Sequence, residues 1–350
     1  MADGYSGLGV CKKCLENRAW NREYMETHAF IYDDQVRRYH NDWHNDIKQL
    51  PLRLENEHPF LYYGMEVEVG FDIDITHVYQ VESDDYDEED TDGGEDIAYV
   101  LREFSKITDG MFVYEEDSTL TNGVEFISRP CSYAYWTHPD TVEKLKKGLD
   151  FLKEQGAWVE QPTNHGMHVH LSQKFFRRGR MNVTTDEARA EFDWLFQKFQ
   201  PELEKLGGRK WTEWCEGKAD KAKRALNESL RCVGNVDVEA KCKLKKGGEL
   251  PYGDHRSAIN STDNTIEVRI FKSTVDYKQI LANIELVRAF AHAVREKDTE
   301  LSLDELLHTK ETKFLDEHIQ KTRMECRKNK EELDLTKVND DEIDFVIERK

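Results

Sequence analysis

A short alternating segment, GMEVEVG at residues 64–70, constrains the fold of this chain more than any other. The side chains of a β-strand alternate between its two faces, so Glu66 and Glu68 point to one side and the apolar residues around them to the other. Like charges at neighbouring positions on one face repel each other. That face is therefore either open to water or occupied by cations.

Three later segments repeat this design of one apolar face and one charged face. The residues on the charged faces are Glu125 and Arg129 in GVEFISRP, His168 and His170 in NHGMHVHLS, and Glu267 and Arg269 in TIEVRIF. Any one of these strands has the pattern of an ordinary solvent-exposed sheet face. Such faces favour Thr, Lys and Ser, whereas these four strands together offer glutamate, histidine and arginine. The combination indicates a metal-binding cleft on an antiparallel sheet.

The residue types in this cleft also indicate which ligands it would hold. Glutamate oxygens with one or two imidazoles suit Mg²⁺ or Mn²⁺, whereas a structural zinc site would use cysteines. Arginines on the same surface suggest that the metal arrives with an anion, such as a nucleotide phosphate. Arg256, upstream of the last strand, is a further candidate. Neither a P-loop nor a GxGxxG motif occurs, so metals and arginines on a sheet would hold the nucleotide.

The hydrophobic periodicity predicts a mixed α+β chain in three parts. The expected strands lie within 60–73, 111–130, 157–162, 166–176, 265–271 and 343–347, and the expected helices at 97–107, 139–156, 185–206 and 277–296. The parts are a leader at 1–57, a catalytic domain at 58–297 and a charged helical extension at 298–350. Residues 82–96 hold ten acidic residues in fifteen, so we expect a solvated inserted loop there rather than a cation-collecting segment.

The bulk composition limits the partners of the chain. Its 350 residues carry a formal net charge of −20, which argues against attraction to nucleic acid or to an anionic membrane surface. Seven cysteines do not make the framework of a secreted disulfide-rich protein, and the N-terminus lacks a signal pattern. No run of 18 apolar residues occurs, so we expect a soluble protein of the reducing cytoplasm.

The leader contains a second candidate metal site. Cys11 and Cys14, together with His40 and His44, have the pair spacings of a zinc site. The 25 residues between the two pairs are many for a zinc finger, and His28 is a competing ligand. Structural zinc, free surface thiols and redox chemistry all stay open for this segment.

The motifs of the catalytic domain, in their order along the chain, resemble the amidoligase family. They read GMEVEVG, DSTLTNGVEFISRP, NHGMHVHLS and RSAINSTDNTIEVRIFKST. This family belongs to the glutamine synthetase-like superfamily of carboxylate–amine ligases, and the resemblance covers about residues 60–295. It implies an antiparallel sheet curved into a half-barrel, with helices on the outer face and the active site on the concave face.

The resemblance also implies roles for individual residues. The implied metal ligands are Glu66, Glu68, Glu125 and Glu267, joined by His168 and His170 on metal or phosphate. The other implied roles are Arg269 on the transferred phosphate, Arg256 and Asn260 near the substrate, and Asp117 and Ser118 at the border of the cleft. Glu66, Arg256 and Arg269 are thus the candidate catalytic residues. Arg129 joins the cofactor-binding candidates, although it has no firm counterpart in the family.

The reaction follows from the same resemblance. Members of the superfamily activate a carboxylate with ATP and Mg²⁺, and an amine then displaces phosphate from the acyl phosphate. An ATP-dependent ligase acting on a small-molecule or peptide carboxylate and an amine is therefore expected. Three other classes stay open: a phosphotransferase of the same fold, a redox-metal enzyme using HVH and a glutamate, and a non-catalytic metal-binding scaffold. The sequence leaves the two substrates and the oligomeric state undecided.

Overall fold

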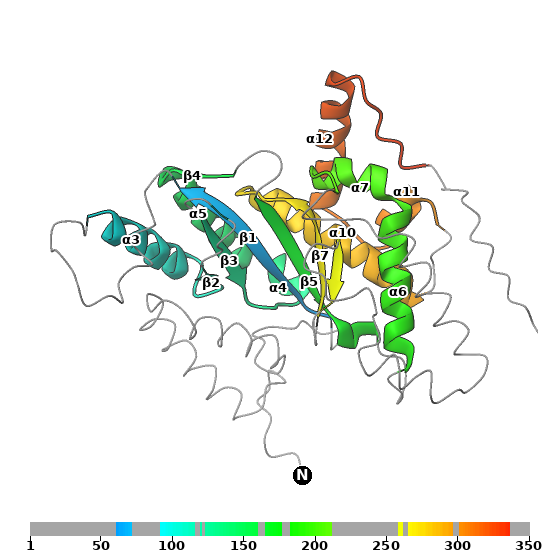
Figure 1. Ribbon diagram of the computed structural model, residues 1–350, viewed down its shortest axis with the longest axis horizontal. Helices are drawn as coiled ribbons and strands as arrows, with labels where there is room; N and C mark the ends of the chain where they lie inside the picture. The colour runs from blue at the N-terminus through cyan, green and yellow to red at the C-terminus, as the bar shows by residue number, and fades with distance from the viewer. Residues whose placement is uncertain are drawn as a thin grey trace, which may run out of the picture. The chain divides into compact units, whose positions relative to one another are not determined.

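The computed structural model describes residues 61–71, 92–115, 120, 123–159, 165–176, 183–211, 258–261, 265–296 and 301–336, whose helices and strands are labelled in Figure 1. The chain divides into two compact units. The first contains Met1–Ser172 and Lys272–Leu281, and the second contains Gln173–Phe271 and Ala282–Lys350. Each unit combines antiparallel strands with helices, so the predicted mixed α+β class is confirmed.

Strand β1 is the centre of the sheet in the first unit. It lies antiparallel between β3 and β5, while β2 pairs with β3 and β4 pairs with the end of β1. The bounds are β1 Tyr63–Phe71, β2 Phe112–Glu115, β3 Gly123–Ser128, β4 Ala157–Trp158 and β5 Gly166–Ser172. The register sets Glu68 opposite Glu125 and Glu66 opposite His168. The charged faces of these three strands therefore coincide, as their alternation predicts.

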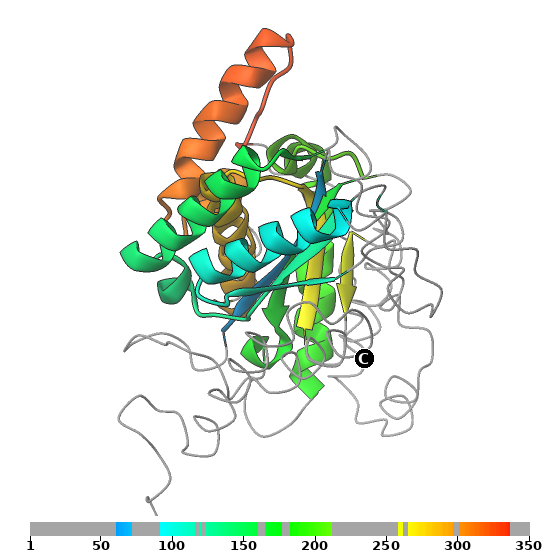
Figure 2. The same cartoon turned by 90° about the vertical axis from the view of Figure 1, so that its left-hand side faces the viewer.

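Three helices cover the apolar face of this sheet (Figure 2). They are α3 Asp92–Ile107, α4 Tyr133–Trp136 and α5 Pro139–Glu154. The ring of Phe104 in α3 lies 4.7 Å from that of Phe126 and 5.3 Å from that of Phe112, and burying one such ring contributes about 1.5–3 kcal/mol. The indole Nε1 of Trp136 donates to the carbonyl of Tyr63 at 2.9 Å. Because helices take the apolar face, the glutamates and histidines share the opposite one.

The second unit contains an antiparallel strand pair and a group of helices. Its elements are η3 Gln173–Phe176, α6 Val183–Lys198, α7 Gln200–Gly207, β6 Ile259–Ser261, β7 Thr265–Lys272, α10 Tyr277–Glu296, α11 Leu303–Leu307 and α12 Phe314–Lys328. The core between helices α6 and α10 is aromatic. The ring of Phe196 lies 4.8 Å from that of Phe192 and 4.1 Å from that of Phe290. Such ring pairs hold the helices at a fixed separation.

A buried carboxylate fixes the start of α12 in the same unit. The side chain of Glu285, in α10, accepts the backbone N–H of Lys313 at 3.2 Å and that of Leu315 at 2.7 Å. These N–H groups belong to the first turn of the helix, where no intrahelical acceptor exists. The imidazole Nε2 of His318 adds a 2.7 Å contact to the carbonyl of Leu206 in α7. The C-terminal helices are therefore integral to this unit.

Several element boundaries differ from the expectation. The helix expected at 185–206 is divided into α6 and α7, because Pro201 has no N–H and its ring clashes with the preceding turn. Helix α3 begins at Asp92 rather than Ile97. The last five residues of the predicted 82–96 loop are thus helical, and the first ten lie outside the described residues. So do the leader at 1–57 and the strand expected at 343–347.

The expected curvature is not found in the first unit. Its sheet is open at β2, which pairs only with β3 among the described strands. The sheet also lacks the strong curl of a half-barrel (Figure 1). The antiparallel pairing is as expected, whereas the half-barrel shape is not. No helix in the described part of the chain is long and apolar enough to cross a membrane.

Gly70, at the end of β1, is required by the ring that packs on it. A Cβ at this position would lie 2.7 Å from the Trp158 ring, whereas a Cβ at Gly64 would lie 3.8 Å from its nearest neighbour, His170. Gly70→Ala should therefore lower the free energy of unfolding by about 1–3 kcal/mol. Gly64→Ala is the matched control and should leave stability unchanged or slightly raised. Urea unfolding measures both, and equal effects would contradict this account.

His292 in α10 should make the protein sensitive to acid. Burial lowers the pKa of its imidazole to about 4, aided by the charges of Lys310 and Arg288 and opposed by a hydrogen bond with Glu296. The unfolded chain, with a pKa near 6.5, then binds more protons, so stability is complete above about pH 6.5 and falls towards pH 4. In urea unfolding between pH 7 and pH 5, His292→Gln should lose less stability than the wild type. Identical pH slopes would exclude this role.

Candidate metal centre

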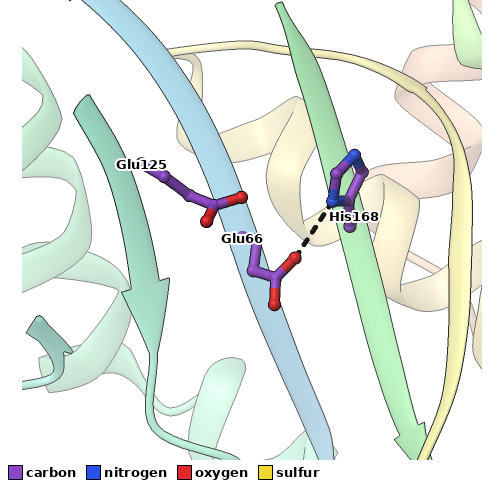
Figure 3. Close-up of side chains that lie close together, drawn as sticks. All are labelled: Glu66, Glu125 and His168. Atoms are coloured by element: carbon purple, nitrogen blue, oxygen red, sulfur yellow. Dashed lines mark hydrogen bonds and ion pairs between the residues drawn. The ribbon is translucent and has the colours of Figure 1, made fainter. Parts of the chain in front are cut away.

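Three neighbouring strands bring a carboxylate-rich cluster together in the first unit. Glu66 lies on β1, Glu125 on β3 and His168 on β5 (Figure 3). One donor atom from each of the three lies within 4.8 Å of the others. Such a spacing allows all three side chains to bind one cation. The antiparallel register produces this geometry, because it aligns positions that are far apart in the sequence.

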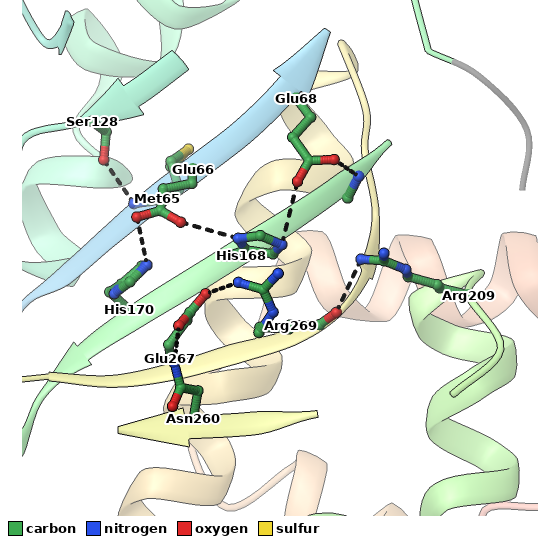
Figure 4. Close-up of polar contacts among 11 residues, drawn as sticks. Met65, Glu66, Glu68, Ser128, His168, His170, Arg209, Asn260, Glu267 and Arg269 are labelled. Carbon is green, nitrogen blue, oxygen red and sulfur yellow. Dashed lines mark hydrogen bonds and ion pairs between the residues drawn. The ribbon is translucent and has the colours of Figure 1, made fainter. Parts of the chain in front are cut away.

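The carboxylate of Glu66 is held between two imidazoles (Figure 4). Its Oε2 lies 3.0 Å from Nδ1 of His168, and its Oε1 lies 3.0 Å from Nε2 of His170. Both oxygens therefore have a fixed direction. Since the two histidines are i and i+2 on β5, they reach Glu66 from one strand.

Glu68 is held by hydrogen bonds to its side chain and to its main chain. The amide of Gly166 donates to its carboxylate, and the hydroxyl of Ser273 donates to its main-chain carbonyl. Its Oε1 also lies 3.6 Å from Nε2 of His168. Next to Gly166, the His165 ring stacks on the indole that packs over Gly70, with centroids 5.0 Å apart. The end of β1 and the start of β5 are thus locked around Glu68.

Burial makes the charge of this cluster energetically important. The side chains of Glu66 and Glu68 are only 12% and 7% exposed. Burial raises the pKa of Glu66, but the charge of His170 and hydrogen bonds from His168 and His170 outweigh it, so the pKa lies well below its usual range. The group is therefore ionised at neutral pH. Buried charges of this kind require compensating partners, which imidazolium groups or a bound cation supply.

The donor set fits a divalent cation of the Mg²⁺ or Mn²⁺ type. Two of the three side chains in the cluster are carboxylates, which these hard cations prefer, and the third is an imidazole. No thiol takes part among the described residues of the cluster, unlike in most structural zinc sites. A second carboxylate on β1, Glu68, lies next to His168 and adds negative charge.

The β6–β7 pair of the second unit carries polar residues of its own (Figure 4). Asn260 is opposite Glu267, and its Nδ2 donates to Oε2 of that carboxylate at 2.8 Å. The guanidinium of Arg269 pairs with the other oxygen, Oε1. The predicted side-by-side placement of these two β7 residues is therefore observed. Whether they share one cleft with the first unit's glutamates stays a prediction.

Other predicted site residues lie outside the described part of the chain. They are Arg256, Asp117, Ser118, and the leader residues Cys11, Cys14, His40 and His44. Arg129 is described, and it follows the last residue of β3 rather than continuing its alternation. Its backbone N–H donates to the carbonyl of Met111 at 2.8 Å. Its assignment to the cofactor stays a prediction.

The sequence analysis missed residues that support the charged face. Ser172 follows His168 and His170 on the same face of β5, and its buried hydroxyl has no partner in the described part of the chain. The alternation of HVHLS contained that signal. Ser273 contacts Glu68 from a segment more than two hundred residues away, and no local pattern predicts such a contact.

Comparison with known protein families identifies the chain. A family model described as "Putative amidoligase enzyme" matches residues 61–291, which include β1, β3, β5 and the β6–β7 pair. The chain belongs to this family. Membership in the amidoligase family confirms the resemblance drawn from the four motifs. No curated protein matches the amidoligase chain.

If the cluster binds a divalent cation, removing the carboxylate of β3 should weaken that binding. We expect Glu125→Gln to raise the dissociation constant for Mn²⁺ at least about tenfold, because an amide oxygen carries no net charge. Titration calorimetry with Mn²⁺ alone measures this change. Glu143→Gln, on the exposed surface of α5, is the matched control and should bind as the wild type does. Equal Mn²⁺ affinity in all three proteins would exclude Glu125 as a ligand.

Proposed function

We propose that this amidoligase joins a carboxylate to an amine with ATP and Mg²⁺ or Mn²⁺, through an acyl phosphate. The observation that carries the proposal is the cluster of Glu66, Glu125 and His168 within the region matched by the family. A ligase of this type needs cation-binding carboxylates at fixed positions. The cluster supplies two of them on the adjacent strands β1 and β3, beside an imidazole on β5.

Charge explains why the reaction needs this arrangement. A carboxylate attacking the terminal phosphate of ATP brings together about five negative charges. Bound divalent cations would neutralise the phosphate oxygens and so lower the electrostatic barrier. The residues of the first unit hold the positions of such cations: Glu66 is fixed by two imidazoles and Glu68 by the amide of Gly166. Fixed carboxylates need no reorganisation during the reaction.

His168 orients Glu66 in this proposal. With a proton on Nδ1, it donates to Oε2 of Glu66 at 3.0 Å, which fixes the direction of that oxygen. The imidazole would join Glu66 and Glu125 on one cation by exchanging this hydrogen bond for a bond to the cation.

The second unit would supply cationic and polar groups. We assign Arg269 to the transferred phosphate, with Glu267 pairing with its guanidinium and Asn260 donating to the other oxygen of Glu267. In the first step a carboxylate oxygen attacks the terminal phosphorus and ADP leaves. In the second step the amine attacks the acyl carbon, loses a proton, and inorganic phosphate leaves with the C–O electron pair. Arg256 and Asn260 remain the proposed substrate contacts.

Among the other classes, the redox-metal enzyme is disfavoured by the donor set. A facial triad uses two imidazoles and one carboxylate, whereas this cluster has one imidazole and two carboxylates. A phosphotransferase of the same fold would use the same cation-binding groups. The two differ in their acceptors: a ligase requires both an acid and an amine before ADP accumulates, while a phosphotransferase requires one acceptor.

Glu66→Gln tests the proposal directly. Wild-type protein should be stabilised by about 2.7 kcal/mol when MgATP is present at about 100 times its dissociation constant. The variant should lose that stabilisation and also ADP release with acid and amine pairs, because a neutral amide does not replace the carboxylate. Thermal unfolding and an ADP-release assay provide the two measurements.

The results of these two measurements distinguish the ligase from the other proposed classes of protein. Wild-type activity in Glu66→Gln would contradict the proposed role of the cluster. ADP release that depends on only one acceptor would replace the ligase by a phosphotransferase. Absence of any nucleotide-dependent stabilisation in the wild type would reject ATP as the co-substrate.

A further inference from the structure

The segment LGGRKW, residues 206–211, passes close to β7 in the second unit. Helix α7 ends at Gly207, where an added Cβ would lie 2.5 Å from the carbonyl oxygen of Ile270. Gly208 follows with φ 67°, a left-handed conformation that glycine adopts without strain. These two glycines bring the chain against β7 and then turn it, which positions Arg209 beside that strand.

Arg209 is a buried cation with one hydrogen bond to the described part of the chain. The residue is 5% exposed, and its guanidinium donates from Nη1 to the main-chain carbonyl of Arg269 at 3.3 Å (Figure 4). Within the described part of the chain it contacts no carboxylate. The acidic residue of β7, Glu267, already accepts from Asn260 on one oxygen and pairs with Arg269 on the other.

An anion would complete the hydrogen bonding of this guanidinium. A guanidinium has five N–H donors and stays charged at all physiological pH values. Taking such an ion out of water is costly, and a single bond to a neutral carbonyl offsets only part of that cost. A bound oxyanion would accept several of the remaining donors and neutralise the charge.

A second buried donor lies two residues further along. Trp211 is 8% exposed, and its indole Nε1 has no acceptor in the described part of the chain. The intervening Lys210 is exposed and pairs with Glu204 at 3.2 Å. Burial thus alternates along 209–211, and the two buried residues both have N–H groups without an acceptor in the described part of the chain.

We propose that Arg209 and Trp211 form a phosphate-binding site on the second unit, beside the Glu267–Arg269 pair. Phosphate fits because its several oxygens can accept from both the guanidinium of Arg209 and the indole N–H of Trp211. Arginine is also the usual residue for bidentate phosphate binding. The inference deepens the proposed function and rests on it only for the source of the phosphate, which would be the nucleotide. Arg209 is therefore an anion-binding residue that the motifs did not reveal.

Two adjacent cations give a matched test. Arg209→Gln and Lys210→Gln remove the same charge from neighbouring positions, one buried and one exposed. Binding of inorganic phosphate, MgATP, adenosine and acetate is measured by titration calorimetry on the full chain. Arg209→Gln should weaken phosphate and MgATP binding by about ten- to a hundredfold. Arg209→Lys should recover part of the loss, Trp211→Phe should weaken both ligands, and Lys210→Gln should bind as the wild type does.

Thermal unfolding provides a readout that a purely structural role would not give. Without ligand, Arg209→Gln should be at least as stable as the wild type, because it removes a buried charge without a carboxylate partner. Phosphate should raise the unfolding temperature of the wild type and not that of Arg209→Gln. A marked loss of stability in the variant without ligand, together with unchanged phosphate affinity, would make Arg209 structural and overturn the proposal.

The other outcomes distinguish this proposal from the proposed function. If the wild type binds MgATP and Arg209→Gln binds it equally well, the phosphate site is overturned while the ligase assignment stands. If phosphate binds in an Arg209-dependent manner but MgATP does not, the site stands and the nucleotide assignment fails. If acetate binds as tightly as phosphate, the site is one for carboxylates and the proposal is overturned. A wild type that binds neither phosphate nor MgATP overturns both.

Discussion

The burial of ionised carboxylates on one face of a sheet is the constraint on which the first unit depends. Glu66 and Glu68 lie where a globular protein would normally place apolar or paired groups, and their charges must be balanced. Imidazoles from β5 and a backbone amide provide the contacts found within the unit. The apolar face of the same strands is covered by α3 and α5. The free energy of that packing offsets the cost of burying charged side chains on the other face.

The alternation within individual strands was sufficient to predict much of this face. Because the period of a strand is two, Glu66, Glu68, Glu125, His168 and His170 were expected on one side before any pairing was known, and the register aligns them. The periodicity also located α5 and α10 closely. Predictions failed where a single residue overrides a pattern, as Pro201 does between α6 and α7.

Contacts between distant segments were beyond sequence reasoning. The hydroxyl of Ser273 reaches the carbonyl of Glu68, and the fit of Trp158 over Gly70 depends on how β4 meets β1. No local pattern marks Arg209 as buried, because its burial follows from the close approach of Gly207 to β7 rather than from its neighbours in sequence. The sequence shows that a side chain is charged, but it does not show whether that side chain is buried or exposed to solvent.

The capping of α12 by Glu285 has a consequence for length variation at the C-terminus. Residues after about 300 would pass for a dispensable charged tail, yet Lys313 and Leu315 satisfy a carboxylate buried in α10. A chain shortened before these residues would remove both of these donors from the buried carboxylate and so destabilise the unit. Loss of the segment that carries these two residues should therefore be accompanied by loss of the acidic side chain at position 285. Related chains that lack this segment are expected to have a non-acidic residue at that position.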